Sequence, residues 1–328
     1  MATTMTKANS PGQTLRRLFV AAPYATPVDL RGRKIIVTGA SPGSIGYATA
    51  RTLAAWGAEA IITTRANAEA AAAAIVAELP SNCPGSVVGH PLDLCDASSV
   101  DSFVGWYRAT QGERLDALIN NAGVHLDLRS QWKTPHLSAD GHEIHWRTNY
   151  LGTMHLTHRL LALLVATGRQ YGEARIVNVV SMLHEKGRNE GFFQQLQPYN
   201  SWVAYGTSKL ALMHATFELQ RRYAADHVQA YCLHPGAVFT NIADKGLAGQ
   251  RLLIALRKLL APVEAFFLLT PEEGAQTQIH CATSPVPPGG LYYRDCQPAQ
   301  ASRAADDSTA ARRLWEETQA WLARIEST

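Results

Sequence analysis

The sequence predicts an α/β protein: one doubly wound domain in which a mostly parallel sheet carries helices on both faces. Short apolar runs rich in β-branched residues recur along the chain, and helix-forming stretches of about 10 residues or more separate them. Strands that alternate with helices in this way form right-handed βαβ units, whose strands are parallel and buried on both faces. The chain has 328 residues, of which 46% are hydrophobic and 17% charged, so it can bury a large core.

The expected elements follow one another from residue 34 to residue 233. Lys34–Thr38 is the first strand, because an apolar, β-branched run there breaks at once into a Gly-rich turn. By the same patterns, strands are expected at 60–64, 86–92, 115–119, 175–180 and 228–233, and helices at 47–56, 66–79, 97–110, 142–167 and 205–225. Beyond them, 246–269 is predicted to be helical and unusually apolar, 285–290 a turn-rich loop, and 305–325 a charged terminal helix.

The turn after the first strand predicts a nucleotide site. Gly39, Gly43 and Gly46 lie between this strand and the next helix. Backbone amides can approach a pyrophosphate closely only where side chains are absent, and the N-terminus of the following helix attracts negative charge. The alternative is a glycine turn that ends the strand for steric reasons alone.

The chain is predicted to form one continuous domain with short appendages. No repeat at a fixed period and no low-complexity linker divides it. We expect an N-terminal arm at 1–31, a Rossmann-type domain at 32–300 and a C-terminal helix at 301–328. The arm carries basic residues and no acid up to residue 28, but it lacks the apolar segment of a secretory signal, which leaves an organelle-targeting alternative open.

Charge, cysteine content and hydropathy exclude several classes of protein. The 30 Lys and Arg against 27 Asp and Glu leave a net charge of +3 without a basic block, so nucleic acid is not expected as a partner. Five scattered cysteines without a C-x-x-C pair indicate reduced thiols and a cytoplasmic protein. The longest apolar stretch, 252–269, contains charged residues and a proline, so no transmembrane segment is expected. The spacings of His142 with His145 and of His155 with His158 do not match a zinc motif, so no metal site is expected either.

Tyr205 and Lys209 are the strongest candidates for chemistry, because residues four apart lie on one face of a helix. A free Tyr has a pKa of about 10, too high to exchange protons at neutral pH. One positive charge about 4 Å away contributes roughly 4 kcal/mol at an effective dielectric of about 20, enough to bring the pKa of the phenol close to 7. A hydroxyl such as that of Ser181, at the end of a strand, would hold the reacting oxygen. Taken singly, each residue has a structural alternative: a half-buried Tyr, a solvated Lys, a Ser cap.

Further motifs in a fixed order resemble the short-chain dehydrogenase/reductase family over residues 32–300. The resemblance implies catalytic roles for Asn149, Ser181, Tyr205 and Lys209, with Lys209 also reaching the nicotinamide ribose and Asn149 holding a water. It implies a cofactor site made of Thr38, Gly39, Ser41, Gly43, Ser44, Ile45, Gly46, Asp93, Leu94, Asn121, Ala122, Gly123, Pro235, Gly236, Val238 and Thr240, together with Tyr205 and Lys209. One departure is the G-x-x-x-G-x-x-G spacing of the first turn, one residue longer than the family's G-x-x-x-G-x-G.

Within the family, the chain is most similar to the retinol dehydrogenase and WW-domain oxidoreductase group. The shared segments are T-N-Y-L-G at 148–152, R-I-V-N-V at 175–179, S-K-L at 208–210, T-P-E-E-G-A-Q at 270–276 and Y-R-D-C at 293–296. The group also has the same long stretch between Ser181 and Tyr205. Light-dependent protochlorophyllide reductases share much of this layout.

The end of the second strand predicts the coenzyme. An acid about 20 residues beyond the glycines would bind a ribose 2′-hydroxyl, whereas an Arg would accommodate a 2′-phosphate. Here Arg65 follows Thr63 and Thr64, and no acid occurs before Glu69, which favours NADP over NAD. The alternative is an exposed Arg65 that only precedes the next helix.

An apolar stripe after the Pro235–Gly236 loop bears on the substrate. Its members recur at helical spacing: Leu252, Leu256, Leu259, Leu260, Val263, Phe266 and Phe267. If 246–270 is a substrate lid rather than ordinary core, the substrate is apolar.

The preferred interpretation is an NADP(H)-dependent oxidoreductase that interconverts an alcohol and a ketone or aldehyde on a lipophilic molecule, retinoid-, steroid- or aliphatic-like. The alternatives are a cofactor-binding interaction protein without turnover and a carbon–carbon double-bond reductase of the protochlorophyllide type. Assembly into a homo-oligomer is left open.

Overall fold

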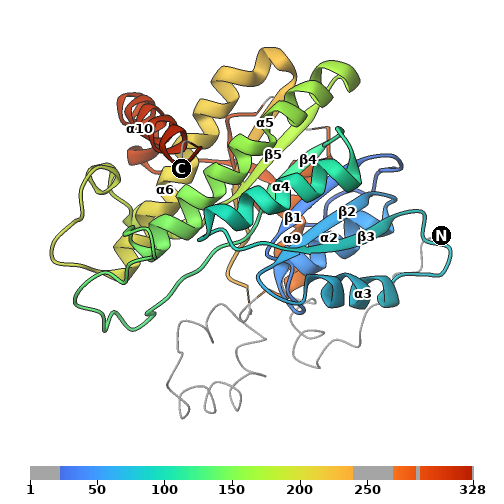
Figure 1. Cartoon of the computed structure of the whole chain (residues 1–328), viewed down its shortest axis with the longest axis horizontal. Helices are drawn as coiled ribbons and strands as arrows, with labels where there is room; N and C mark the ends of the chain where they lie inside the picture. Colours follow the sequence, from blue (N-terminus) through green and yellow to red (C-terminus); the bar gives the residue numbers. More distant parts are fainter. Residues whose placement is uncertain (1–22, 239–268, 286–288, 327–328) are drawn as a thin grey trace, which may run out of the picture.

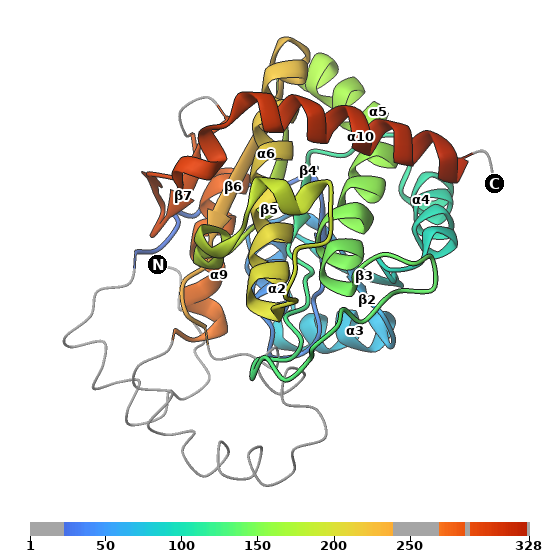
Figure 2. The same ribbon diagram turned by 90° about the vertical axis from the view of Figure 1, so that its left-hand side faces the viewer.

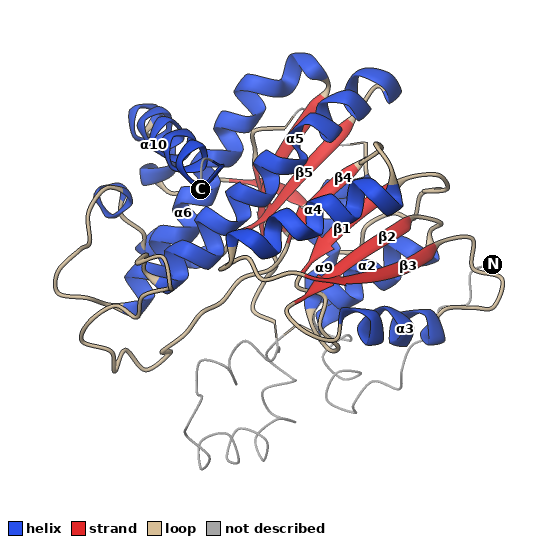
Figure 3. Ribbon diagram, viewed as in Figure 1, coloured by secondary structure: helices blue, strands red, loops and turns tan. Residues whose placement is uncertain are grey.

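The computed structural model describes residues 23–238, 269–285 and 289–326 and confirms the doubly wound α/β fold (Figure 1 and Figure 3). Within these residues the sheet has eight strands in the order β3-β2-β1-β4-β5-β6-β7-β8. All neighbouring strands are parallel except β7 and β8. The strands are β1 (Lys34–Thr38), β2 (Glu59–Thr64), β3 (Ser86–Pro91), β4 (Ala117–Asn120), β5 (Ala174–Val179), β6 (Val228–His234), β7 (Tyr292–Arg294) and β8 (Gln297–Ala299). The α-helices are α2 (Ile45–Ala55), α3 (Ala68–Glu78), α4 (Ala97–Gln111), α5 (Gly152–Tyr171), α6 (Ser201–Tyr223), α9 (Pro271–Thr283) and α10 (Ser308–Glu326).

Helices cover the sheet on both faces, and each face has its own hydrophobic core. One core joins α4, α5, α6 and α10, and the other joins α2, α3 and α9. Strand β1 serves both cores: Ile36 belongs to the first, and Ile35 and Val37 belong to the second. Successive side chains of a strand point to opposite faces, so a strand buried on both faces reads as a continuous apolar run.

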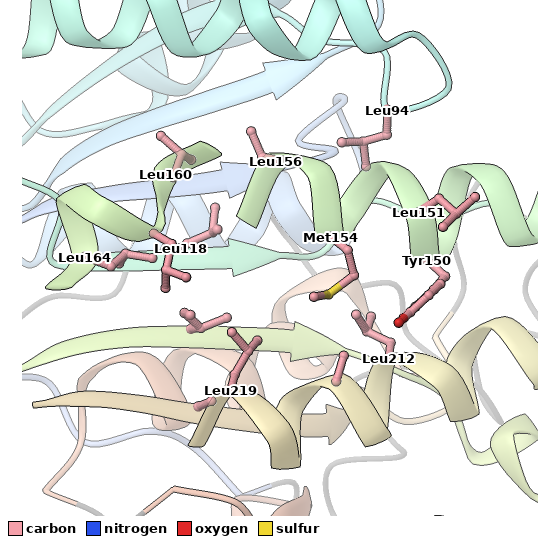
Figure 4. Packing of buried hydrophobic residues seen from close by; sticks show 14 of the residues in the cluster. Leu94, Leu118, Tyr150, Leu151, Met154, Leu156, Leu160, Leu164, Leu212 and Leu219 are labelled. Atoms are coloured by element: carbon pink, nitrogen blue, oxygen red, sulfur yellow. The ribbon is translucent and has the colours of Figure 1, made fainter. Parts of the chain in front are cut away.

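The first core shows how the helix sequence matches its place on the sheet. Leu156, Leu160 and Leu164 recur every four residues along α5 and belong to the same hydrophobic cluster as Leu118 of β4, with Leu164 next to Leu118 (Figure 4). Leu212 of α6 packs into the same cluster. The four-residue spacing places these side chains on one helix face, which explains why the helix packs along the strands.

The observed elements differ from the predicted ones mainly at their ends. Helix α6 begins at Ser201, four residues before the expected start, because the side chain of Asn200 accepts hydrogen bonds from the amides of Trp202 and Val203. The helix expected from residue 142 begins instead with a π-helical turn, η1 (Trp146–Leu151). Strands β7 and β8 were not predicted, because three-residue strands carry no readable alternation.

Helix α9 was also not predicted, although its start has a strong local signal. Thr270 and Glu273 form a capping box, and Pro271 occupies the first turn. The expected apolar helix at 246–269 lies outside the described residues except for its last residue. The predicted lid at 246–270 lies outside them except for its last two residues. The turn-rich loop at 285–290 is described except for 286–288.

The two ends of the described chain pack against the domain. The amide of Ala25, in the predicted N-terminal arm, donates to Gln276 Oε1 at 3.0 Å, and the amide of Leu30 donates to the carbonyl of Trp56 at 2.9 Å. Residues 25–30, at the end of the predicted arm, are therefore attached to the domain. Helix α10 crosses the outside of α6 (Figure 2). None of the helices in the described ranges combines the length and apolarity needed to cross a bilayer.

Two glycines test the packing of the fold. A Cβ at Gly152, the first residue of α5, would collide with the carbonyl oxygen of Leu94, whereas a Cβ at Gly105 in α4 would meet no atom within 4 Å. We expect Gly152→Ala to destabilise the protein by about 1–3 kcal/mol, because backbone must move. Gly105→Ala is the matched control and should stabilise it by about 0.5–1 kcal/mol, because Ala is the better helix former. Urea unfolding measures both changes, and equal effects of the two variants would contradict this account of the packing.

Candidate active site

A cavity of about 530 Å³ lies at the carboxyl ends of the parallel strands, where open α/β sheets bind ligands. It brings together thirteen of the predicted site residues: Gly39, Ser41, Ser44, Ile45, Arg65, Asp93, Leu94, Asn121, Ala122, Gly123, Tyr205, Lys209 and Pro235. Six further residues do not line it directly: Thr38, Gly43, Gly46, Asn149, Gly236 and Val238. Ser181 is not among the lining residues either, but it contacts Tyr205. Thr240 lies outside the described residues.

The Gly-rich turn fits closely between β1 and the loop after β4. Gly39 has a φ of +73°, and a Cβ there would lie 2.8 Å from the Cα of Ala122. A Cβ at Gly46 would lie 2.7 Å from the carbonyl oxygen of Gly39. Ser44 caps helix α2 by accepting a hydrogen bond from the amide of Tyr47 at 3.1 Å. The turn therefore presents backbone and the positive end of a helix to the cavity, an arrangement suited to a phosphate group.

The loop after β4 is tied to β1 by polar contacts. Asn121 Nδ2 donates to the carbonyl of Thr38 at 2.7 Å, and the amide of Ala122 donates to Thr38 Oγ1 at 2.9 Å. Gly123 lines the cavity and packs closely against two polar side chains. A Cβ there would lie 3.1 Å from Lys209 Nζ and 3.3 Å from Asn149 Oδ1. Thr38 and Asn121 therefore shape the site by holding its walls together.

Two predicted cofactor residues lie at the ends of β2 and β3. Arg65 is exposed and borders the cavity beside Thr63 and Thr64, which carry no charge. Asp93 Oδ1 accepts a hydrogen bond from the amide of Cys95 at 2.9 Å, which orders the start of that loop. Near the end of β2 the cavity wall therefore offers a cation.

Tyr205 and Lys209 lie together with Ser181 in the cavity region, but their ionisation differs from the prediction. Burial raises the pKa of Tyr205 to about 12, although its hydrogen bond with Ser181 acts to lower it. Burial also lowers the pKa of Lys209 to about 8. Lys209 Nζ donates to the carbonyl of Val179 at 2.9 Å and lies 5.9 Å from the centre of the Tyr205 ring. The prediction that Lys209 brings the pKa of the phenol close to 7 is wrong for the protein alone, because desolvation raises the pKa of Tyr205 and only the hydrogen bond with Ser181 acts to lower it.

Asn149 lies in the π-helical turn η1 and is fully buried. Its Oδ1 accepts from the amide of Val124 at 2.7 Å, and its Nδ2 donates to the carbonyl of Val124 at 2.9 Å and to Ser208 Oγ at 3.1 Å. The side chain therefore joins η1, the loop after β4 and helix α6. Its predicted role as a water ligand is not tested by these contacts.

Sequence reasoning missed His125, which stacks on Tyr205 with ring centroids 4.1 Å apart and planes 13° from parallel. The only local signal was its position two residues after the N-N-A-G segment. His145, considered only for metal binding, accepts a hydrogen bond from the amide of Leu126 at 2.9 Å and contacts Glu143 at 2.7 Å. In the part of the chain that the structure describes, no group of three His, Cys, Asp or Glu side chains is placed to hold a metal.

Comparison with known proteins identifies the family. The family model described as short chain dehydrogenase matches residues 33–250. The chain belongs to the short-chain dehydrogenase family. It is 37% identical over 309 residues to retinol dehydrogenase 12 of Bos taurus, covering 92% of this chain and 90% of that protein. It is 38% identical over 305 residues to retinol dehydrogenase 14 of Mus musculus, covering 88% and 85%.

A crystal structure of an uncharacterized protein from Mycobacterium paratuberculosis is similar with a TM-score of 0.66 and 31% identity, covering 92% of this chain and 98% of that one. As a short-chain dehydrogenase, the protein is an NAD(P)-dependent oxidoreductase that acts on alcohols and carbonyls. Within the family it lies near the retinol dehydrogenases, as its sequence motifs predicted.

The contacts of Asn149 lead to a prediction about stability. Asn149→Ala leaves the amide and carbonyl of Val124 without their side-chain partner, and each unsatisfied buried group costs about 1–3 kcal/mol. We expect a lower free energy of unfolding in urea. Asn82→Ala, at an exposed position, is the control and should change it by less than about 0.5 kcal/mol. Equal stability of the two variants would mean that Asn149 does not hold this loop.

Proposed function

We propose that the protein is an NADP(H)-dependent oxidoreductase that interconverts an alcohol and a ketone or aldehyde on a lipophilic small molecule. The observation that carries the proposal is the contact of Tyr205 with Ser181 beside the buried Lys209, in a cavity that also contains the Gly-rich turn and Arg65. Tyr205, Ser181 and Lys209 can transfer a proton, and the Gly-rich turn with Arg65 can bind a nucleotide. No other site among the described residues combines these features.

The residues present fit a nicotinamide dinucleotide. Gly39 and Gly46 let the turn pack closely against its neighbours, a Cβ at Gly43 would meet no atom within 4 Å, and the capped start of α2 faces the same turn. The hydrogen bond to Val179 uses one of the three N–H donors of Lys209, so the ammonium group can also serve ribose hydroxyls. The dinucleotide, when bound, would supply or accept the hydride at the substrate carbon.

The chain's own residues would manage the proton. In reduction, the hydroxyl of Tyr205 gives its proton to the carbonyl oxygen as the carbon receives a hydride, and in oxidation the phenolate takes a proton from the alcohol. Ser181 donates a hydrogen bond to the same oxygen and keeps it beside Tyr205. A pKa of about 12 in the protein alone leaves Tyr205 protonated at neutral pH, which suits it to donate a proton in the reduction. Phenolate formation for oxidation would need added positive charge, which an oxidised nicotinamide carries.

The coenzyme preference rests on Arg65. It borders the cavity at the end of β2, and the neighbouring Thr63 and Thr64 offer no carboxylate to a ribose 2′-hydroxyl. A guanidinium group there can pair with a 2′-phosphate through charge-assisted hydrogen bonds. This arrangement supports NADP over NAD.

The substrate class rests on the other wall of the cavity. Val124, Leu126, Ile144 and Val180 line it and offer apolar surface beside Tyr205. Relatives that are 37% and 38% identical to this chain over the aligned residues are named retinol dehydrogenases, which also supports a lipophilic alcohol or its carbonyl form. A lid at 246–270 stays a prediction.

The protein is also proposed to be cytoplasmic. All five cysteines are free thiols, which supports this location.

The direct test follows NADPH consumption with a panel of apolar ketones and aldehydes, and NADP reduction with their alcohols. Turnover of at least one apolar pair, with NADPH preferred to NADH, is expected. Absence of turnover with every apolar pair, or a preference for small polar substrates, would contradict the proposal.

Tyr205→Phe tests the proton route. The variant keeps the ring and its packing but removes the hydroxyl, so kcat should fall by about 10²–10⁴, the usual contribution of general acid–base catalysis. NADPH affinity, followed by fluorescence, should stay nearly unchanged. Lys209→Ala is the comparison and should lower both kcat and cofactor affinity. Wild-type turnover by Tyr205→Phe would eliminate the proposed proton donor.

Arg65→Glu tests the coenzyme preference. Replacing a cation by an anion should weaken NADPH and favour NADH, since a charge-assisted pair contributes about 1.5–3 kcal/mol, or roughly 10- to 150-fold in affinity. Arg312→Glu, on the exposed face of α10, makes the same charge change away from the cavity and should leave the preference as it is. An unaltered NADPH:NADH ratio in Arg65→Glu would show that Arg65 does not read the 2′-phosphate.

A further inference from the structure

His125 is enclosed by aromatic rings next to the candidate proton donor. Its imidazole lies flat on the ring of Tyr205, at 4.1 Å between centroids and 13° between planes. The ring of Trp202 meets the imidazole edge-on at 4.7 Å and 85°. His125 is only 6% exposed, and both of these aromatic neighbours lie on α6. The face of Tyr205 is therefore in contact with a ring that comes from a different part of the chain.

The backbone on both sides of His125 is held in place. Before it, the amide and carbonyl of Val124 both bond to the side chain of Asn149. After it, the amide of Leu126 donates to His145 Nε2 at 2.9 Å, and the carbonyl of Asp127 accepts from Ser201 Oγ at 2.8 Å. With both flanks fixed, the backbone of His125 is held beside Tyr205 by several hydrogen bonds.

His145 is itself fixed by a carboxylate. Its Nε2 accepts a hydrogen bond, so its Nδ1 carries the proton and donates to Glu143 Oε1 at 2.7 Å. The hydroxyl of Tyr199 donates to the same carboxylate oxygen at 3.0 Å, and the amide of Trp146 donates to Oε2 at 2.8 Å. The support of the His125 loop thus extends to the long segment between Ser181 and Tyr205.

His125 contacts the rings of Tyr205, Trp202 and His145. Its Nε2 is buried and has no hydrogen-bond partner in the described residues. Burial, together with His145, Lys209 and Lys186, lowers the pKa of His125 to about 4 against the opposing effect of Asp127. The imidazole is therefore neutral at physiological pH and adds no second cation beside Lys209.

We propose that His125 is a positioning residue for the reaction: its stacked ring holds the phenol of Tyr205 in the orientation in which the hydroxyl meets Ser181 and the reacting oxygen. The inference rests on the proposed function of Tyr205 as proton donor. Proton transfer requires heavy atoms about 2.6–3.2 Å apart. A misplacement of about 1 Å can reduce the rate about 10²-fold. A ring held on one face has fewer orientations to sample than one open to the cavity.

A pair of substitutions separates stacking from hydrogen bonding. His125→Phe keeps an aromatic ring and removes both ring nitrogens, whereas His125→Gln keeps polar atoms and removes the ring. If His125 acts by stacking, kcat should fall about 10- to 100-fold in His125→Gln and stay within about fivefold of wild type in His125→Phe. KM and NADPH affinity should change little in either variant, and the midpoint of the kcat–pH profile should not move.

His136→Gln provides the matched control. His136 belongs to the same loop and stacks on Trp132 with centroids 3.6 Å apart, but it is exposed and does not line the cavity. The kcat of His136→Gln should equal that of the wild-type enzyme. The three variants are measured with the substrate that the wild-type enzyme turns over, so an inactive wild-type enzyme counts against the proposed function and not against His125 in particular.

The result that overturns the inference is a reversed order. If His125→Gln is as active as His125→Phe or more active, a ring nitrogen contributes and stacking does not. If both variants keep the wild-type kcat, His125 has no role in the reaction. Should neither variant fold, as judged by thermal unfolding, Trp202→Leu removes the ring behind His125 and leaves the imidazole. That variant must then lower kcat with KM unchanged, and a wild-type kcat would equally overturn the inference.

Discussion

The buried side-chain amide of Asn149 joins three segments that are distant in the sequence, and the geometry of the site depends on it. It bonds to both backbone groups of Val124 and to Ser208 of α6, while it sits in a π-helical turn that precedes α5. A buried amide of this kind has few alternative partners, so its network has one arrangement of low energy. The positions of Gly123, Lys209 and His125 follow from that arrangement.

Burial governs the charge of the site more strongly than the proximity of Tyr205 and Lys209 does. Taking either group out of water disfavours its charged form, so the pKa of the phenol rises to about 12 and that of the ammonium falls to about 8. Both shifts act against the ion pair that sequence spacing suggests. The protein alone therefore keeps the proton on Tyr205, and in the proposed function the charge that favours its release would come from the nucleotide.

The two cores of the sheet explain why this site is rigid where chemistry is proposed. Helix α5 packs on β4 and β5 and carries leucines at four-residue spacing, while α6 packs on β5 and β6, so η1 and the first turns of α6 lie next to a packed layer. Gly152 allows the start of α5 to approach the carbonyl of Leu94 closely, which brings the loop after β3 next to η1. Rigid elements of this kind hold side chains more accurately than loops do.

The sequence by itself determined the features that local patterns encode. Lys34–Thr38 and the Gly-rich turn after it are readable from apolar runs and glycine spacing, and the four-residue step from Tyr205 to Lys209 follows from helical periodicity. The mostly parallel sheet and most helices follow from the alternation of elements, whereas the strand order was not predicted. The family resemblance adds Asn149 as a candidate site residue and supports Ser181, whose hydroxyl at the end of a strand is a candidate on its own.

Tertiary structure decided what depends on contacts between distant residues. His125 meets Tyr205 across 80 positions of sequence, and no periodicity in either segment indicates the stack. The pKa of Tyr205 depends on how much water the surrounding elements exclude, which spacing along a helix cannot reveal. Strands β7 and β8 form because β6 offers an edge to pair with, since three residues are too few to specify a strand locally.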